Sequence, residues 1–302
     1  MLTSVKLGYG KEEKLLIVNA DDFGLTRSVN DGIVELLKQQ AVSSASIMMN
    51  CPWSPDAVKK AANLPDADIG IHWTLTSEWP LYRWGPLYRN GSTGSLTDKD
   101  GWFPAGIADV ERLADPQELR NELIAQLEAA RKAGISVTHA DSHMGSLYGL
   151  VTGRDFLLIA FDICAEYGLP FRLPRKMLPL VGSFITQDLL ERAKTRARQA
   201  EERGVVLPDY IIGPVYHLRP GQTYDDIKAE GIFLLRSLMP GVTEWISHPA
   251  QASGDMKAFH LQWEKRVMEM AFWTDPDVQQ VMRQEKIRMI GWKELQQLQQ
   301  SA

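Results

Sequence analysis

Short apolar runs rich in β-branched residues alternate with amphipathic segments along almost the whole chain. The apolar runs predict strands over 14–18, 44–49, 68–73, 135–140, 169–173, 209–212, 242–247 and 287–290. The amphipathic segments predict helices over 28–37, 55–63, 115–133, 154–167, 186–203, 223–238, 258–273 and 292–299. Strands that alternate with helices build right-handed βαβ units, so the sequence predicts a parallel sheet.

The length of the chain favours closure of that sheet into a barrel. The 302 residues show no break in composition, no low-complexity segment and no short repeat, so we expect a single domain over residues 1–302. We predict a distorted (β/α) barrel of seven to eight parallel strands. A doubly wound open sheet is the alternative that the same alternation allows.

Residues with strong capping preferences mark several predicted helix ends. Ser28 and Asp31 have the spacing of an S-x-x-D helix start. Asp115 is placed to cap the helix that follows it, and Gly134 and Gly168 are placed to end helices. These positions set the predicted boundaries of the first, third and fourth helices.

Residues 76–114 interrupt the alternation with a long irregular segment. This segment contains Pro80, Pro86 and Pro104, five glycines, and the tryptophans Trp79, Trp84 and Trp102. A loop of this length in a compact domain is usually a lid, a binding loop or disordered. We expect an inserted loop here, and its role is open at this point.

The charge balance argues against a nucleic-acid partner. Lys and Arg number 33 and Asp and Glu number 38, which gives a net charge of −5 and no basic footprint. No apolar run approaches the roughly 20 residues of a membrane span, and Met1 to Lys14 lacks the apolar core of a signal peptide. Cys51 and Cys164 are too few for a disulfide framework, although they could pair. We therefore expect a cytoplasmic protein without a membrane partner.

Polar residues suited to metal binding or proton transfer lie on or just after five predicted strands. They are Asp21, Asp22, His72, His139, Asp141, His143, Arg172 and His248. The carboxyl ends of barrel strands meet on one face, where barrel enzymes build their active sites. One carboxylate and two imidazoles, from Asp22, His72 and His143, would form a three-ligand set for a divalent metal.

Several of these residues also have a structural explanation. Asp21 and Asp22 could serve as a cap and a turn residue, with side chains that diverge because strand neighbours point to opposite faces. His72 could be a buried histidine with satisfied hydrogen bonds, and Asp141 could orient one imidazole and cap the next turn. Structural histidines have no reason to lie at the same end of several strands, so the shared placement favours a site.

Four motifs along the chain resemble those of the YdjC-like carbohydrate deacetylases. They are Asn19-Ala20-Asp21-Asp22-Phe23-Gly24, Gly70-Ile71-His72, Thr138-His139-Ala140-Asp141-Ser142-His143 and Ser247-His248-Pro249, in the order of the family. The resemblance implies a distorted (β/α) barrel related to polysaccharide deacetylases. It also implies metal-dependent hydrolysis of an N-acetyl group on an amino sugar.

The same resemblance assigns roles to individual residues. The implied metal ligands are Asp22, His72 and His143. The implied catalytic residues are Asp21 as the base, Arg172 as the arginine that pairs with the base, and His248 as the acid. His139 or Asp141 is a candidate to fix the tautomer of a ligand histidine.

We expect one divalent metal ion as the cofactor. Mixed Asp and His ligation suits Zn²⁺, Mn²⁺, Co²⁺ or Fe²⁺, whereas Mg²⁺ prefers oxygen ligands. The resemblance keeps Mg²⁺ open, so the expectation is for Zn²⁺ or Mg²⁺.

The chain departs from the family next to its last ligand histidine. The family often continues in a D-S-H-x-H-x-H pattern, whereas residues 141–146 here read Asp-Ser-His-Met-Gly-Ser. The ligand is present, but the neighbouring substrate subsite is expected to differ. Four tryptophans could stack on sugar faces or pack in the core: Trp73, Trp79, Trp84 and Trp102. The expected partner is a small carbohydrate substrate, and a homodimer is possible.

Two other functions are compatible with these residues. The first is a metal hydrolase of another amide or an ester on the same barrel. A phosphoester site would want a glycine-rich nest or a basic cluster, and only Arg172 and Arg175 are near. The second is a non-catalytic carbohydrate-binding protein, which the presence of both Asp21 and His248 disfavours.

Overall fold

The computed structural model describes residues 1–177 and 187–301. The strands are β1 (Lys14–Phe23), β2 (Ser44–Ile47), β3 (Ile69–Trp73), β4 (Val137–Ser142), β5 (Tyr210–Ile212), β6 (Gly241–Ser247) and β7 (Ile287–Met289). The α-helices are α1 (Thr3–Lys6), α2 (Arg27–Lys38), α3 (Ser54–Ala61), α4 (Ile107–Leu113), α5 (Pro116–Lys132), α6 (Leu157–Tyr167), α7 (Gln187–Glu202), α8 (Tyr224–Arg236), α9 (Gly254–Phe259), α10 (Trp263–Thr274), α11 (Pro276–Gln284) and α12 (Trp292–Gln300). Two 3₁₀ turns, η1 (Gly94–Leu96) and η2 (His143–Gly145), complete the described elements.

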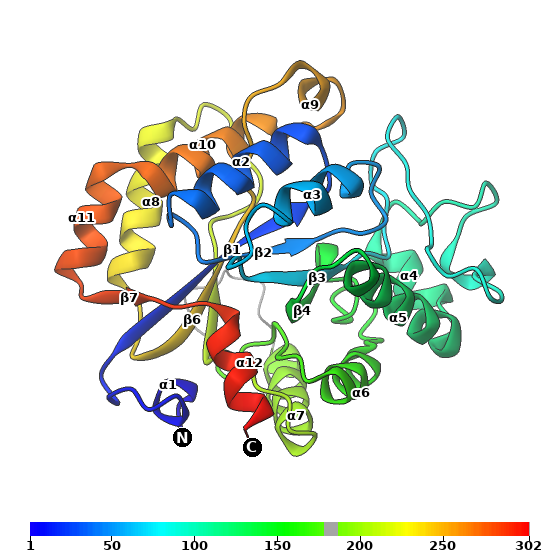
Figure 1. Cartoon of the computed structure of the whole chain (residues 1–302), viewed down its shortest axis with the longest axis horizontal. Coiled ribbons are helices and arrows are strands. Elements are labelled where there is room, and N and C mark those ends of the chain that lie inside the picture. Colours follow the sequence, from blue (N-terminus) through cyan, green and yellow to red (C-terminus); the bar gives the residue numbers. More distant parts are fainter. Residues whose placement is uncertain (178–186, 302) are drawn as a thin grey trace.

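The strands form one parallel sheet in the order β4-β3-β2-β1-β6-β5, with β7 beside β1. Along one edge β1 pairs with β6, and along the other it pairs first with β7 and then with β2. Helices surround this curved sheet (Figure 1). The predicted distorted (β/α) barrel is confirmed, and the doubly wound alternative is not adopted.

The predicted strand at 169–173 is wrong. The described residues there form a single bridge between Phe171 and Ala140 instead of a ladder. The carbonyl of Pro170 accepts from the Ala140 N–H at 3.0 Å, and the Arg172 N–H donates back to the Ala140 carbonyl at 3.0 Å. Pro170 and Pro174 flank these bonds and have no N–H group, so neither residue can donate to extend the ladder.

The segment around Arg172 nevertheless closes the side of the barrel between β4 and β5. Phe171 donates its N–H to the Val206 carbonyl at 3.1 Å, and Lys176 donates to the Asp209 carbonyl at 2.9 Å. The same segment is bonded to β4 through Ala140. Arg172 therefore projects from a connection that is held on both sides.

Helix boundaries follow the capping residues with one exception among those predicted. Asp115 caps α5 by accepting from two backbone N–H groups, and Gly168 ends α6 in a left-handed conformation. The predicted start of α2 at Ser28 is wrong, because Thr26 is the residue that caps it. The predicted helix over 258–273 is divided between α9 and α10, and the predicted start at Thr186 lies outside the described residues. No helix in the described ranges is long and apolar enough to cross a membrane.

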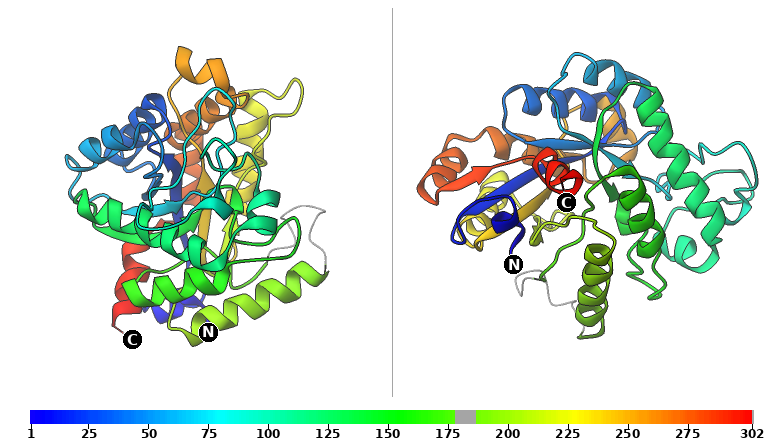
Figure 2. Two further views of the ribbon diagram at one scale, coloured as in Figure 1. Left: turned by 90° about the vertical axis from the view of Figure 1, so that its right-hand side faces the viewer. Right: turned by 60° about the horizontal axis from the view of Figure 1, so that its bottom comes forward.

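β1 separates two cores because alternate strand residues point to opposite faces. Its outer-facing residues Leu16, Val18 and Ala20 belong to the large core beneath the helices. On the inner side, Leu15 and Ile17 pack with Trp292 and Leu295 of α12. Figure 2 (right) shows α12 near the middle of the surrounding helices. Apolar side chains therefore fill the amino-terminal end of the barrel.

The carboxyl-terminal half of the barrel interior is polar. Asn19 and Asp21 continue the inner face of β1, and β3, β4 and β6 contribute His72, Asp141 and Glu244. All five side chains are buried. Buried charged groups are costly unless they are paired or meet a cation, so this layer indicates a functional site.

The residues predicted as an inserted loop, 76–114, are irregular apart from η1 and α4. They extend away from the sheet beside α5, in cyan in Figure 1. Glu122 of α5 anchors them by accepting hydrogen bonds from the N–H groups of Leu87 and Tyr88, at distances of 2.8 to 3.0 Å. The inserted segment is thus fixed to the barrel at its middle.

Candidate active site

A register break at the end of β1 aims two successive aspartates into one cavity. Between Ala20 and Phe23 the pairing of β1 with β2 shifts, and Asp22 adopts a left-handed backbone with φ of 69°. The side chains of Asp21 and Asp22 therefore do not diverge as regular strand geometry predicts, and both line the same cavity. Gly24 makes the turn possible, since its φ is 104° and a Cβ there would lie 2.9 Å from the Met48 carbonyl oxygen.

This cavity has a volume of about 600 Å³ and lies at the carboxyl ends of the strands. Six predicted site residues line it: Asp21, Asp22, His72, His143, Arg172 and His248. The structure thus brings together residues from the ends of β1, β3, β4 and β6 and from the connection that carries Arg172. The expectation that the strand ends converge on one face is met for every member of this set.

Asp22, His72 and His143 present ligand atoms to one another. Oδ1 of Asp22 is 3.3 Å from Nε2 of His72 and 3.2 Å from Nδ1 of His143. The two imidazole nitrogens are 3.2 Å apart. All three side chains are buried, and Oδ1 of Asp22 accepts no hydrogen bond from the residues that the structure describes. These atoms are grouped as the ligands of a single metal ion would be.

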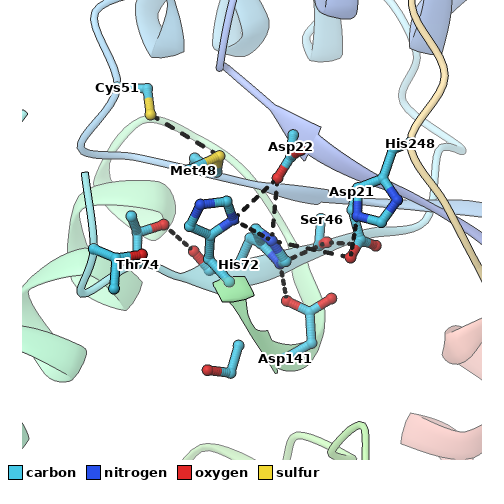
Figure 3. Close-up of polar contacts among 12 residues, drawn as sticks. Asp21, Asp22, Ser46, Met48, Cys51, His72, Thr74, Asp141 and His248 are labelled. Carbon is cyan, nitrogen blue, oxygen red and sulfur yellow. Dashed lines mark hydrogen bonds and ion pairs between the residues drawn. The ribbon is translucent and has the colours of Figure 1, made fainter. Parts of the chain in front are cut away.

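Each imidazole of this group has a carboxylate on its far side. Nδ1 of His72 is 2.5 Å from Oδ1 of Asp141, and Nε2 of His143 is 3.1 Å from Oε1 of Glu78 (Figure 3 shows the His72 contacts). A carboxylate accepts the N–H of a neutral imidazole and leaves the other nitrogen as an acceptor. When both imidazoles are neutral, three acceptors face one another without a donor between them, which is the arrangement that a divalent cation fits.

The carboxylates around the two histidines also favour positive charge at this point. Burial disfavours a charged His72, but Asp141 and Asp21 outweigh it and raise the pKa of His72 to about 10. Burial also disfavours a charged His143, but Glu78 and Asp22 outweigh this effect and raise the pKa of His143 to about 9. The pKa of Asp22 lies well below its usual range, because Arg266 and the two imidazoles overcome the cost of burial. The same field would attract a metal cation.

A second group, Asp21, His72 and Asp141, also has metal-ligand spacing. Its carboxylates already face a cation, because Arg172 contacts Asp141 at 2.8 Å and both oxygens of Asp21. The group around Asp22 is therefore the better candidate for a metal.

Asp21 is held by Arg172 and by Asn19. Arg172 donates from Nη1 to Oδ2 at 2.6 Å and from Nη2 to Oδ1 at 2.7 Å, and the Asn19 amide donates to Oδ1 at 2.7 Å. Burial would raise the pKa of Asp21, but Arg172 and His72 hold it well below its usual range. Asp21 is therefore an ionised carboxylate with a fixed orientation. It lies beside the metal-type group, by which we mean Asp22, His72 and His143.

His248 follows β6 and faces Asp21 across the cavity. Its Nε2 is 3.9 Å from Oδ2 of Asp21, and its ring contacts the Tyr216 ring edge-on at a centroid distance of 5.0 Å. Its backbone N–H donates to Glu269 at 2.6 Å. Burial lowers the pKa of His248, although Asp22 and Asp21 oppose the shift.

Sequence reasoning missed four ionisable residues that hold the site. Arg266 of α10 donates to Oδ2 of Asp22, Glu269 of α10 holds the His248 backbone, and Glu244 accepts from Arg172 at 2.9 Å. The fourth is Glu78, described above. The sequence offered a signal for Glu244, because a carboxylate inside a β-branched run is costly without a partner. The helix residues offered no such signal.

The structure favours one alternative at each of two points that the sequence left open. Asp141, rather than His139, contacts a predicted ligand; His139 stacks on Trp292 at 4.8 Å. Among the residues that line the cavity are Tyr148 and Tyr216, but none of the four tryptophans proposed as sugar-stacking residues. Trp73 and Trp84 are instead buried in the main core.

Known proteins resemble this chain along most of its length. A carbohydrate deacetylase from Thermoanaerobacter pseudethanolicus is 31% identical over 281 residues, covering 92% of this chain and 98% of the relative. One from Brevibacillus brevis is 29% identical over 282 residues, covering 93% and 99%. A solved structure from Enterococcus faecalis, described as a candidate cellobiose-phosphate cleavage protein, shares the fold with a TM-score of 0.74 and 24% identity, covering 94% of this chain and 99% of that chain. The family model described as YdjC-like protein matches residues 15–284, and the chain therefore belongs to the YdjC-like family.

Proposed function

We propose that this chain is a metal-dependent carbohydrate deacetylase that hydrolyses the N-acetyl group of an amino sugar. Deacetylation of a carbohydrate is supported by the relatives named carbohydrate deacetylase, which match over 92% and 93% of the chain. The observation that carries the finer proposal is the single cavity in which the Asp22, His72 and His143 group lies beside Asp21 and His248. This cavity would then contain a metal site, a base and a proton donor close together.

Asp22, His72 and His143 would hold the metal, through Oδ1, Nε2 and Nδ1 respectively. A bound divalent ion supplies Lewis acidity to the acetyl carbonyl and lowers the pKa of water from about 15.7 towards ~7. The two nitrogen ligands favour Zn²⁺ over Mg²⁺, which prefers oxygen. We carry both ions into the experiment below, and Zn²⁺ is the first choice.

Asp21 acts as the base that takes a proton from the attacking water. The positive charge of Arg172 lowers the pKa of Asp21 and keeps its carboxylate ionised. Hydrogen bonds from Arg172 and Asn19 fix the orientation of the carboxylate. Asp21 directly precedes the proposed ligand Asp22 in the chain, and both side chains line the same cavity. General-base catalysis of this kind contributes typically ~10²–10⁴ in rate.

His248 acts as the acid that gives a proton to the leaving amine. Its lowered pKa means that a neutral imidazole is the resting form near neutral pH. The proton that Asp21 takes from water can pass to His248 through one bridging water, because the 3.9 Å between Oδ2 of Asp21 and Nε2 of His248 exceeds direct hydrogen-bond distance. Cleavage of the C–N bond then returns this proton to the amine nitrogen, so both residues end the cycle in their starting states.

The cavity suits a small carbohydrate. Its volume of about 600 Å³ is within the ~300–1,000 Å³ of small-molecule sites. Tyr148 and Tyr216 offer aromatic surface to the C–H faces of a sugar, while Leu150 and Ile246 provide apolar contacts. Gly145 lines the cavity at a position where the family often has a further histidine, which supports a substrate subsite that differs from the family's.

The remaining expectations about partners and location are part of the proposal. We expect no nucleic-acid partner, because the net charge is −5. A cytoplasmic location is supported by Cys51 and Cys164, which are buried and unpaired. A homodimer stays a prediction, for which size-exclusion chromatography with light scattering is the direct measurement.

Acetate release tests the proposed function. The purified protein is incubated with N-acetylated mono- and oligosaccharides, after metal removal and again with added Zn²⁺ or Mg²⁺. We expect metal-dependent acetate release from at least one N-acetyl sugar. O-acetyl sugars and N-acetylated non-sugar amides form the comparison panel, and activity on these alone would replace the proposal with another amide or ester hydrolase. Sugar binding without turnover at any metal concentration would indicate a non-catalytic carbohydrate-binding protein.

A further inference from the structure

The inserted segment 76–114 sends one carboxylate to the metal-type group. Oε1 of Glu78 is 3.1 Å from Nε2 of His143, and the Thr76 hydroxyl donates to the same oxygen at 2.5 Å. The Glu78 side chain is only 14% exposed. Its second oxygen is buried and has no hydrogen-bond partner among the described residues. Glu78 therefore makes a directed contact with a predicted metal ligand.

This contact decides which nitrogen of His143 can bind a metal. A neutral imidazole has one N–H group, and a carboxylate can only accept. The N–H of His143 therefore lies at Nε2, towards Glu78. Nδ1 is left with its lone pair directed at Oδ1 of Asp22 and Nε2 of His72, each 3.2 Å away. Without Glu78 the proton could occupy either nitrogen.

The other predicted ligand histidine is oriented in the opposite sense. Asp141 holds Nδ1 of His72 at 2.5 Å, so His72 offers Nε2. Asp141 comes from β4 of the barrel itself, whereas Glu78 comes from the inserted segment. The two histidines thus reach the same point through different ring nitrogens, each with its own carboxylate behind it.

The backbone around Glu78 is rigid enough to serve this purpose. The Ser77 N–H donates to the Pro104 carbonyl at 2.8 Å, which ties the start of the segment to the stretch just before α4. The buried Trp84 donates its ring N–H to the Thr76 carbonyl at 2.8 Å and its backbone N–H to the Ser77 hydroxyl at 3.1 Å. Trp79 packs on His260 at a centroid distance of 4.9 Å. Residues on both sides of Glu78 are therefore fixed.

We propose that Glu78 is a positioning residue of the metal centre, which fixes His143 so that Nδ1 is its metal ligand, and that the inserted segment completes this centre. The inference rests on the metal site of the proposed function, but not on the reaction or the substrate. It gives the segment a role that is independent of sugar binding.

Zn²⁺ titration calorimetry on the metal-free protein tests the first half of the proposal. Loss of the carboxylate behind a ligand histidine typically weakens metal binding by about 10–100-fold. We expect this weakening for Glu78→Ala and a smaller one for Glu78→Gln, whose amide oxygen can still accept the His143 N–H. Asp98→Asn is the matched control, because Asp98 lies in the same segment and pairs with Arg83 at 2.9 Å. The control should bind Zn²⁺ like the wild type.

A histidine spectrum tests the second half. In long-range ¹H–¹⁵N correlation spectra of Zn²⁺-loaded, ¹⁵N-histidine-labelled protein, we expect His143 as the Nδ1-bound, Nε2–H form and His72 as the Nε2-bound form. His143→Ala and His72→Ala identify the signals by their loss. The Glu78→Gln variant, compared with the wild type by circular dichroism, provides the readout if Glu78→Ala does not fold.

The outcomes separate this inference from the proposed function. Unchanged Zn²⁺ affinity in both Glu78 variants, or coordination of His143 through Nε2, would overturn the inference and leave the metal site standing. A wild-type protein that binds no divalent metal would overturn both. Weakened binding with the Nδ1 signature supports the inference even if no acetylated sugar is turned over.

Discussion

Arg172 grips Asp21 with two parallel hydrogen bonds, from Nη1 to Oδ2 at 2.6 Å and from Nη2 to Oδ1 at 2.7 Å. The same guanidinium contacts Asp141 at 2.8 Å and Glu244 at 2.9 Å. One buried cation therefore links β1, β4 and β6 at the level of the candidate active site. Its planar, five-donor geometry suits several carboxylates at once, which a lysine could not reproduce.

Asp21→Asn should separate chemistry from metal binding. The amide cannot take a proton from water, so we expect deacetylation to fall by about 10²–10⁴-fold. Because Asp21 lies outside the ligand group, Zn²⁺ should still bind, in contrast to Asp22→Ala. Steady-state acetate release and calorimetry measure the two effects. An Asp21→Asn enzyme that works at the parent rate would falsify the assignment of the base.

Arg172→Met should destabilise the fold as well as the site. It leaves buried carboxylates without their cation, and breaking a buried pair in this way typically costs about 3–5 kcal/mol of unfolding free energy. Arg192→Met is the control, because Arg192 forms a partly exposed pair with Asp188 at 2.9 Å that is worth at most ~1 kcal/mol. Urea unfolding at pH 7 compares them. If both variants lose the same unfolding free energy, the buried ion pairs of Arg172 contribute no more to stability than the partly exposed pair of Arg192.

His72→Ala should abolish stabilisation by metal. A ligand that binds only the folded state adds about 2.7 kcal/mol when present at 100 times its dissociation constant. The wild type should therefore melt at a higher temperature with Zn²⁺ than with a chelator, and the variant should show no such difference. His217→Ala tests specificity, since His217 lines the same cavity outside the ligand group. If His72→Ala still responds to Zn²⁺ like the wild type, the ligand set is wrong.

Glu244→Gln should change how stability depends on pH. Burial raises the pKa of Glu244 from 4.5 to about 8, although Arg172 pulls it down. Between these values the folded state holds a proton that the unfolded state has lost, so Glu244 makes the wild type less stable as pH rises. The neutral amide avoids this loss. The free energy of unfolding of the variant, relative to that of the wild type, should therefore rise by up to about 1.4 kcal/mol per pH unit in this window.

Urea unfolding at pH 5, 7 and 8.5, with a chelator present, measures this gain. Glu285→Gln serves as the comparison, because Glu285 forms a partly exposed pair with Lys14 at 3.1 Å. Its difference from the wild type should stay small at all three pH values. A Glu244→Gln difference that does not grow with pH would contradict the buried, protonated carboxyl.

The arrangement of the barrel was predictable because it rests on local patterns. Seven of the predicted strands form, and Asp115 and Gly168 bound their helices through short-range hydrogen bonds and backbone conformation. The predicted strand at 169–173 failed because Pro170 and Pro174 prevent a ladder from extending. A short apolar run does not reveal by itself whether a partner edge can pair with it.

Six site residues could also be predicted from the sequence, since a parallel barrel gathers its strand ends on one face. The sequence could not show that Asp21 and Asp22 face the same cavity. Strand alternation predicts that they diverge, and only the register break and the left-handed Asp22 turn both side chains inward. The division of the pair between Arg172 and the two histidines follows from that turn.

The groups that support the site were decided by the tertiary structure alone. Glu78 reaches His143 across 65 positions of sequence, and Arg266 reaches Asp22 across 244. Charged residues on a loop or a helix usually face solvent, so nothing local distinguishes these two. Only the packing of the inserted segment and of α10 against the barrel buries them. Thus local sequence patterns were enough to predict the barrel and its candidate ligands, whereas the burial of residues distant in sequence decides what holds those ligands in place.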